Sequence, residues 1–126
     1  MNNPQNLLPG DASQLVVLIA EDELIVRNVA RISLESEGYF VLVGDDGEEA
    51  LTLSRQFPGN IDALLSDVRM PRLDGLQLRE AMITERPGIR VLLMSGQVDA
   101  PTQDTPFLRK PFTPAILKER MRQLLS

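Results

Sequence analysis

The sequence predicts an α/β fold in which a five-stranded parallel sheet carries helices on both faces. Short apolar runs alternate with helix-patterned segments along the chain, as expected for successive β-α-β units. The run at residues 15–20, Leu-Val-Val-Leu-Ile-Ala, is continuously apolar, which is typical of a strand covered on both sides. The turns between segments are short, and right-handed crossovers then place the strands in one doubly wound sheet.

Each strand is predicted from an apolar, β-rich run that ends at a polar or turn-forming residue. The predicted strands are residues 15–20, 39–43, 61–66, 89–94 and 106–109.

Helices are predicted where apolar residues recur at helical spacing between these strands. The predicted helices cover about 24–37, 46–57, 74–86, and a last segment that starts at 113. The apolar faces that define them are Ile25, Val29 and Ile32 in the first, Ala50, Leu53 and Phe57 in the second, Leu78, Ala81 and Met82 in the third, and Leu117, Met121 and Leu124 in the last.

Capping residues support these helix boundaries. Gly38 lies where a C-terminal cap is expected after the first helix. Asp46 and Glu49 have the spacing of a capping box. Thr113 followed by proline is a typical N-cap with proline at the first helical position.

Residues 1–13 are rich in Asn, Pro and Gly and lack apolar periodicity, so we expect a disordered tail or linker there and one domain over residues 14–126.

Composition excludes several functions. The chain of 126 residues has no Cys and no His, which excludes disulfides, thiolate catalysis, cysteine-based zinc sites and a phosphohistidine carrier role. The net charge of −5 argues against direct nucleic-acid binding. No apolar run reaches the ~18 residues of a membrane helix, and the N-terminus lacks signal-peptide features. We therefore expect a cytoplasmic protein with no membrane partner.

Polar residues follow four of the five predicted strands: Glu21 and Asp22 after the first, Asp67 after the third, Ser95 after the fourth and Lys110 after the fifth. Parallel strands share one carboxyl edge, where open α/β sheets bind ligands. Each residue alone has an ordinary explanation as a helix cap, a turn residue or a solvated lysine. Their joint placement at strand ends favours a functional site.

The residue types indicate phosphoryl chemistry. Three carboxylates held close together repel one another, and a hard cation such as Mg²⁺, which prefers oxygen ligands, relieves that repulsion. A lysine and a hydroxyl beside the cation suit phosphoryl oxygens, and a carboxylate can act as the nucleophile. The sequence has no glycine-rich nucleotide loop, so we expect the donor to be a phosphoprotein or a small phosphodonor.

Four segments in the same order resemble the receiver domain of two-component response regulators, the CheY-like superfamily. They lie within residues 15–125, nearly the whole chain. The matching segments are residues 18–23, 64–71 with Asp74 and Gly75, 91–96 and 107–112.

The resemblance implies a flavodoxin-like sheet of strand order 2-1-3-4-5 and a set of residue roles. Asp67 is implied as the phosphoacceptor, supplied by a histidine kinase or a histidine phosphotransfer protein. The implied Mg²⁺ ligands are Glu21 through water, Asp22, Asp67 and the backbone carbonyl of Arg69. Ser95 and Lys110 are implied to contact the phosphoryl group, with a cis Lys110–Pro111 bond.

A conformational switch is also implied, through Ser95 and the aromatic Phe107, that signals to a downstream protein partner. The implied protein is not an enzyme acting on other substrates, but a phosphoacceptor that assists its own phosphorylation and dephosphorylation.

The chain departs from the family pattern between Ser95 and Lys110, where only fifteen positions separate the two residues. Residues 97–106 contain two prolines and almost no apolar face, which predicts that the fourth helix is short or absent.

Two other functions make different predictions about the residues of this site. A pseudo-receiver that only binds proteins predicts a missing acceptor, metal carboxylate or lysine, and all are present. A metal-dependent phosphatase with an aspartyl intermediate predicts a second carboxylate two residues after the nucleophile, where Arg69 stands. No effector domain follows Ser126, so we expect a stand-alone regulator or a piece of a larger protein such as a hybrid kinase.

Overall fold

The computed structural model of the chain describes residues 14–96 and 104–126. Its strands and helices alternate, and all neighbouring strands are parallel in the order β2-β1-β3-β4-β5, as predicted. The strands are β1 (Val16–Ala20), β2 (Phe40–Gly44), β3 (Ala63–Asp67), β4 (Arg90–Ser95) and β5 (Phe107–Arg109). The helices are α1 (Leu24–Ser36), α2 (Gly47–Gln56), α3 (Gly75–Glu85) and α4 (Pro114–Leu125).

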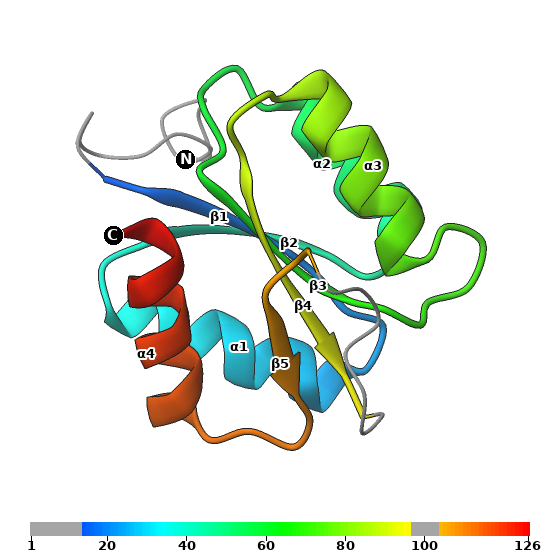
Figure 1. Ribbon diagram of the computed structural model, residues 1–126. Coiled ribbons are helices and arrows are strands. Elements are labelled where there is room, and N and C mark those ends of the chain that lie inside the picture. Colours follow the sequence, from blue (N-terminus) through cyan, green and yellow to red (C-terminus); the bar gives the residue numbers. More distant parts are fainter. Residues whose placement is uncertain (1–13, 97–103) are drawn as a thin grey trace, which may run out of the picture.

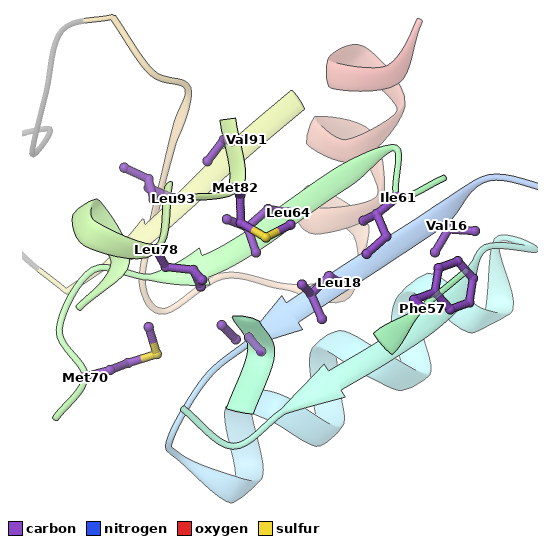
Figure 2. Close-up of a cluster of buried hydrophobic side chains, with 12 residues drawn as sticks. Val16, Leu18, Phe57, Ile61, Leu64, Met70, Leu78, Met82, Val91 and Leu93 are labelled. Carbon is purple, nitrogen blue, oxygen red and sulfur yellow. The ribbon is translucent and has the colours of Figure 1, made fainter. Parts of the chain in front are cut away.

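The sheet is covered on both faces, with α2 and α3 on one side and α1 and α4 on the other (Figure 1). Alternate residues of each strand point to opposite faces, so each central strand feeds two cores. On the side of α2 and α3, Leu18 and Leu64 pack with Leu78 and Met82 (Figure 2). On the side of α1 and α4, the core contains Ile19, Leu65, Leu34, Leu117 and Met121. Burial on both faces explains why β1 is continuously apolar and why β3 is apolar from Ala63 to Leu65.

Helix α1 forms where predicted, but the apolar residues that predicted it do not form its buried face. Ile25 is 78% exposed and Ile32 is 58% exposed, whereas Ala30, Ser33 and Leu34 face the sheet. Small residues lie on the inward face because the helix packs closely against the strands. The apolar stripe that identified the helix is therefore a surface feature.

Side-chain caps fix the starts of three helices. Asp46 accepts the backbone N–H of Glu49, but the Glu49 side chain accepts from Asp45 N–H, so the capping box is only half formed. Thr113 caps α4 as predicted.

The complete capping box is at α3. There Asp74 accepts from Gln77 N–H at 2.8 Å and Gln77 accepts from Asp74 N–H at 3.0 Å. The sequence pattern predicted a helix that starts at Asp74 but not this capping box.

Two sequence predictions fall mainly on residues outside the described part: the tail at 1–13, and the missing fourth helix, of which 97–103 lie outside. Within the described segment between β4 and β5, residues 104–106 form no helix. Among the described residues, no helix is long and apolar enough to cross a membrane.

Candidate functional site

The site lies at the carboxyl edge of the sheet, where β1, β3 and β5 bring Glu21, Asp67 and Lys110 together. The ammonium nitrogen of Lys110 lies 2.8 Å from Glu21 Oε1 and 3.3 Å from Asp67 Oδ2. It also lies 3.5 Å from Oε1 of the exposed Glu23. Glu21 and Asp67 are buried, at 0% and 6% exposure. One lysine is therefore the cationic partner of three carboxylates, and two of these carboxylates are buried.

Asp22 completes an acidic cluster. Glu21, Asp22 and Asp67 each offer one carboxylate oxygen, and the three oxygens lie within 4.8 Å of one another. Asp22 is exposed, so the cluster opens to solvent on one side. An all-oxygen donor set with a buried wall and a wet side fits Mg²⁺, which retains several waters when bound to protein. These residues therefore have the chemistry that the predicted metal requires.

Ser95 and Arg69 line the same depression, which has a volume of about 510 Å³. Ser95 is the last residue of β4 and is 3% exposed, while Arg69 is exposed at the rim. The depression also contains Asp22, Asp67 and Lys110, so all the residues that the sequence placed at strand ends are brought to one region. The role of the Arg69 carbonyl stays a prediction.

Burial and neighbouring charges both shift the pKa values of Glu21, Asp67 and Lys110, and the two effects oppose each other. Burial raises the pKa of Glu21, and hydrogen bonds from Lys110 and the Glu23 backbone oppose that rise. Burial also raises the pKa of Asp67, against the attraction of Lys110. For Lys110, burial alone lowers the pKa, but Glu21 and Asp67 together raise it above its ordinary value. The lysine stays charged because its carboxylate partners surround it.

The backbone beneath Asp67 depends on a glycine. A Cβ added to Gly75 would lie 2.1 Å from the Asp67 carbonyl oxygen, well inside contact distance. The same carbonyl accepts a hydrogen bond from the Ser66 hydroxyl at 2.9 Å. Gly75 therefore lets the start of α3 approach the end of β3, a contact that the sequence pattern did not predict.

Sequence reasoning also missed Arg27, which is 15% exposed at the side chain. Its Nη1 donates to the Glu21 main-chain carbonyl at 3.0 Å, and its Nε lies 3.5 Å from Asp45 Oδ1. Arg27 thus ties the turn that carries Glu21 and Asp22 to the loop after β2. A lone arginine within a helical pattern gives no signal of such a contact.

Phe107, the predicted switch aromatic, is half-buried in β5. Its carbonyl oxygen accepts a hydrogen bond from Arg120 Nη2 at 2.8 Å. The Lys110–Pro111 peptide bond is cis, as the resemblance implied.

Comparison with known proteins agrees with this geometry. The family model described as the response regulator receiver domain matches residues 17–122. The chain belongs to this family. In sequence, it is 34% identical over 117 residues to the sensor kinase CckA of Brucella abortus, covering 87% of this chain and 12% of that protein. It is 35% identical over 118 residues to the response regulator MprA of Mycolicibacterium vanbaalenii, covering 86% of this chain and 49% of that one.

Solved receiver structures share the fold. The receiver domain of the hybrid histidine kinase CckA is 39% identical, with a TM-score of 0.78 over 88% of this chain and 99% of that domain. The chemotaxis protein CheY4 of Vibrio cholerae is 25% identical, with a TM-score of 0.81 over 90% of this chain and 100% of that one. The chain spans half or less of the length of the curated relatives named above. It is thus a receiver domain of two-component signalling, similar to domains found in both kinases and regulators.

Proposed function

We propose that this receiver domain accepts a phosphoryl group on Asp67 from a histidine kinase or a histidine phosphotransfer protein, with Mg²⁺ bound. The observation that carries the proposal is the joint position of Lys110 and the three carboxylates. The Lys110 ammonium lies 3.3 Å from Asp67, whose carboxylate also lies in the cluster with Glu21 and Asp22.

The proposed step is one displacement at phosphorus. An oxygen of the Asp67 carboxylate forms a bond to phosphorus while the phosphorus–nitrogen bond of the donor phosphohistidine breaks, and the imidazole nitrogen keeps the electron pair. Glu21, Asp22, Asp67 and the Arg69 carbonyl would hold Mg²⁺, which when bound neutralises charge on the carboxylates and the phosphoryl oxygens.

The surrounding side chains would hold the transferred group. Lys110 is placed to pair with a phosphoryl oxygen, and Ser95, whose position at the end of β4 borders the same depression, to donate its hydroxyl hydrogen. The domain would thereby assist its own phosphorylation and, with water as the nucleophile at phosphorus, its own dephosphorylation. It would not act on other substrates.

A phosphoprotein donor needs a surface beside Asp67, and the exposed stripe of α1 supplies one. Ile25 and Val29 line a hollow of about 470 Å³ with Pro111 and Phe112, and Lys110 reaches this hollow as well. Exposed apolar surface next to a polar pocket is typical of a protein-binding site. We propose that the donor packs its apolar residues here while its phosphohistidine enters the depression.

Signalling would follow from the added charge. New phosphoryl oxygens would attract Lys110 and Ser95, and β5 begins at Phe107 and ends directly before Lys110. We propose that this movement alters the surface offered to a downstream protein partner, in the cytoplasm.

The test is modification with a small donor. Incubation with Mg²⁺ and acetyl phosphate is expected to add one phosphoryl group by mass spectrometry, and beryllofluoride to change the NMR spectrum around the site. Asp67→Asn is expected to abolish both responses. Asp62→Asn is the matched control, because Asp62 lies just before β3 and accepts the Val16 N–H at the opposite end of the sheet.

Retention of the modification in Asp67→Asn would refute the assignment of the acceptor. No modification of the unaltered chain at saturating Mg²⁺ and donor would favour the pseudo-receiver, a domain that binds proteins without being phosphorylated.

A further inference from the structure

Strand β4 is longer than its outer neighbour, which leaves part of the sheet edge without a strand. The register pairs β5 only with Leu93–Ser95 of the six-residue β4. Residues of a parallel strand bond alternately to the two sides. Arg90 N–H donates to Asp62 on the β3 side at 3.1 Å, and Leu93 N–H donates to Pro106 on the β5 side at 3.0 Å. The N–H and C=O of Val91 therefore face the outer side, where no described strand pairs with them.

This edge forms the floor of a groove of about 490 Å³. Ile83 of α3 lies on one wall and Leu124 of α4 on the other, and Pro106 lies at the end nearest β5. The two helices lie on opposite faces of the sheet (Figure 1). Because residues of both helices line the groove, it follows the edge of the sheet. Ile83 is 40% exposed, and apolar wall surface is thus available to a ligand.

Three arginines from three elements line the groove: Arg79 of α3, Arg90 of β4 and Arg120 of α4. Arg90 Nη1 is fixed by the Leu124 carbonyl at 2.9 Å, and Arg120 Nη2 by the Phe107 carbonyl at 2.8 Å. A guanidinium has five N–H donors, so both side chains are ordered yet retain donors for a ligand.

Arg79 provides a further donor. Its Nε is buried and has no hydrogen-bond partner within the described structure. The one carboxylate among the lining residues, Asp104, lies 3.4 Å from Arg79 Nη2. Beside the groove, Glu80 Oε2 lies 2.5 Å from Arg79 Nη1. Three cations against the two carboxylates of Asp104 and Glu80 still give this groove a positive charge on a chain whose net charge is −5.

We propose that this groove binds an extended acidic segment of a partner protein, which adds a strand to the free edge of β4. Side chains of an added strand alternate between the two faces of the sheet. Carboxylates at successive positions would therefore meet Arg79 on one face and Arg90 or Arg120 on the other, while the segment's backbone pairs with Val91.

The charges favour a foreign segment over the chain itself. Residues 1–13 contain one acidic residue, Asp11, and two copies with a charge of −5 each repel one another. The interaction is separate from phosphoryl transfer, because none of the lining residues is at the acidic cluster.

The probe is a short synthetic peptide, Thr-Val-Asp-Glu-Val-Asp-Glu-Val-Thr, titrated into the full chain and followed by ¹⁵N NMR and fluorescence anisotropy. The expected result is shift changes confined to the groove, with hydrogen exchange of the Val91 amide slowed about tenfold or more at saturation. The matched peptide with Asn and Gln in place of Asp and Glu is expected to bind about tenfold or more weakly, since charge-assisted hydrogen bonds are lost.

Protein variants give the reciprocal test. Arg79→Gln and Arg120→Gln are each expected to weaken binding about tenfold, whereas Arg31→Gln, on exposed α1, leaves it unchanged. Asp67→Asn is expected to bind equally, which separates this proposal from the phosphoacceptor assignment. If a variant misfolds, the Asn and Gln peptide still tests the role of charge on the unaltered chain.

Equal binding of the two peptides, shift changes outside the groove, no binding at millimolar peptide, or unchanged Val91 exchange at saturation would each overturn the proposal. Self-association of the peptide-free chain through this groove, measured by sedimentation, would overturn it in favour of a second copy.

Discussion

Replacing Lys110 with methionine is expected to destabilise the metal-free protein by about 3 kcal/mol at pH 7, and by much less at pH 5. Methionine keeps most of the aliphatic volume of lysine but removes the ammonium. Glu21, at 0% exposure, then loses the cation 2.8 Å away. Removing one partner of a buried ion pair typically costs about 3–5 kcal/mol.

Protonation sets an upper limit on that cost. A carboxylate in an unfavourable environment can become neutral by binding a proton. The free-energy cost of this protonation is about 1.36 kcal/mol for each pH unit above the ordinary pKa of about 4.3. For one carboxyl the limit is about 3.7 kcal/mol at pH 7 and about 1 kcal/mol at pH 5. The destabilisation should therefore grow with pH by at most about 1.4 kcal/mol per unit for each carboxyl affected.

The sign follows from proton linkage. Burial already raises the pKa values of Glu21 and Asp67 in the folded protein, so the folded state binds protons more tightly than the unfolded chain. Stability then falls as pH rises through these pKa values. Loss of Lys110 raises both pKa values further and extends the fall to higher pH. The raised pKa of Lys110 itself has no effect below pH 9, because the lysine is charged in both states there.

The assay is urea unfolding followed by far-UV circular dichroism, at several pH values between 4.5 and 8, with EDTA present. Arg31→Met is the control, because the ion pair that Arg31 forms among the described residues, with Glu35 on α1, is exposed. A loss of stability in Lys110→Met that is the same at every pH would refute the reasoning, since lost packing rather than uncompensated charge would then be the cause.

Three further outcomes test neighbouring features. Asp67→Asn is expected to stabilise the metal-free protein by up to about 1 kcal/mol, because it removes one of the crowded carboxylates, and to reduce stabilisation by Mg²⁺ in the same urea assay. Gly75→Ala is expected to cost about 2 kcal/mol or more, since its Cβ would lie 2.1 Å from the Asp67 carbonyl oxygen. Gly96→Ala, whose Cβ would have no atom of the described residues within 4 Å, should change stability by less than about 0.5 kcal/mol. Arg86→Met is expected to cost about 2–4 kcal/mol in thermal unfolding without affecting phosphorylation, because Arg86 bonds the Ser54 hydroxyl and three main-chain carbonyls at the end of α2.

The sheet could be predicted from sequence because its strands are buried on both faces. A run such as Val16–Ala20 has no polar position, which is typical of a strand in a parallel sheet between helix layers. The residues at the strand ends could be placed together for the same reason, since parallel strands share one edge. Glu21, Asp67 and Lys110 are far apart in sequence, and the topology alone brings them within contact distance.

The contacts that α1 makes could not be predicted in this way. The pattern at Ile25, Val29 and Ile32 predicted the helix correctly, but these residues are exposed, because periodicity does not say on which side the sheet lies. The inward face of α1 uses Ala30 and Ser33, which are too small to dominate a hydrophobic pattern. Arg27 was missed because its partner is a main-chain carbonyl, which any residue could supply.

Lys110 contacts both Glu21 and Asp67, so a change of charge at Asp67 would move this lysine. Its ammonium lies closer to Glu21 than to Asp67, at 2.8 Å against 3.3 Å, so the resting lysine is drawn mainly to the buried glutamate. A phosphoryl group on Asp67 would add negative charge on the Asp67 side of the ammonium and draw the lysine away from Glu21. Lys110 directly follows β5, which at three residues is the shortest strand of the sheet. A short strand has few backbone hydrogen bonds to its neighbour that resist displacement. The charge at Asp67 would therefore act on β5, the strand whose displacement costs the least free energy.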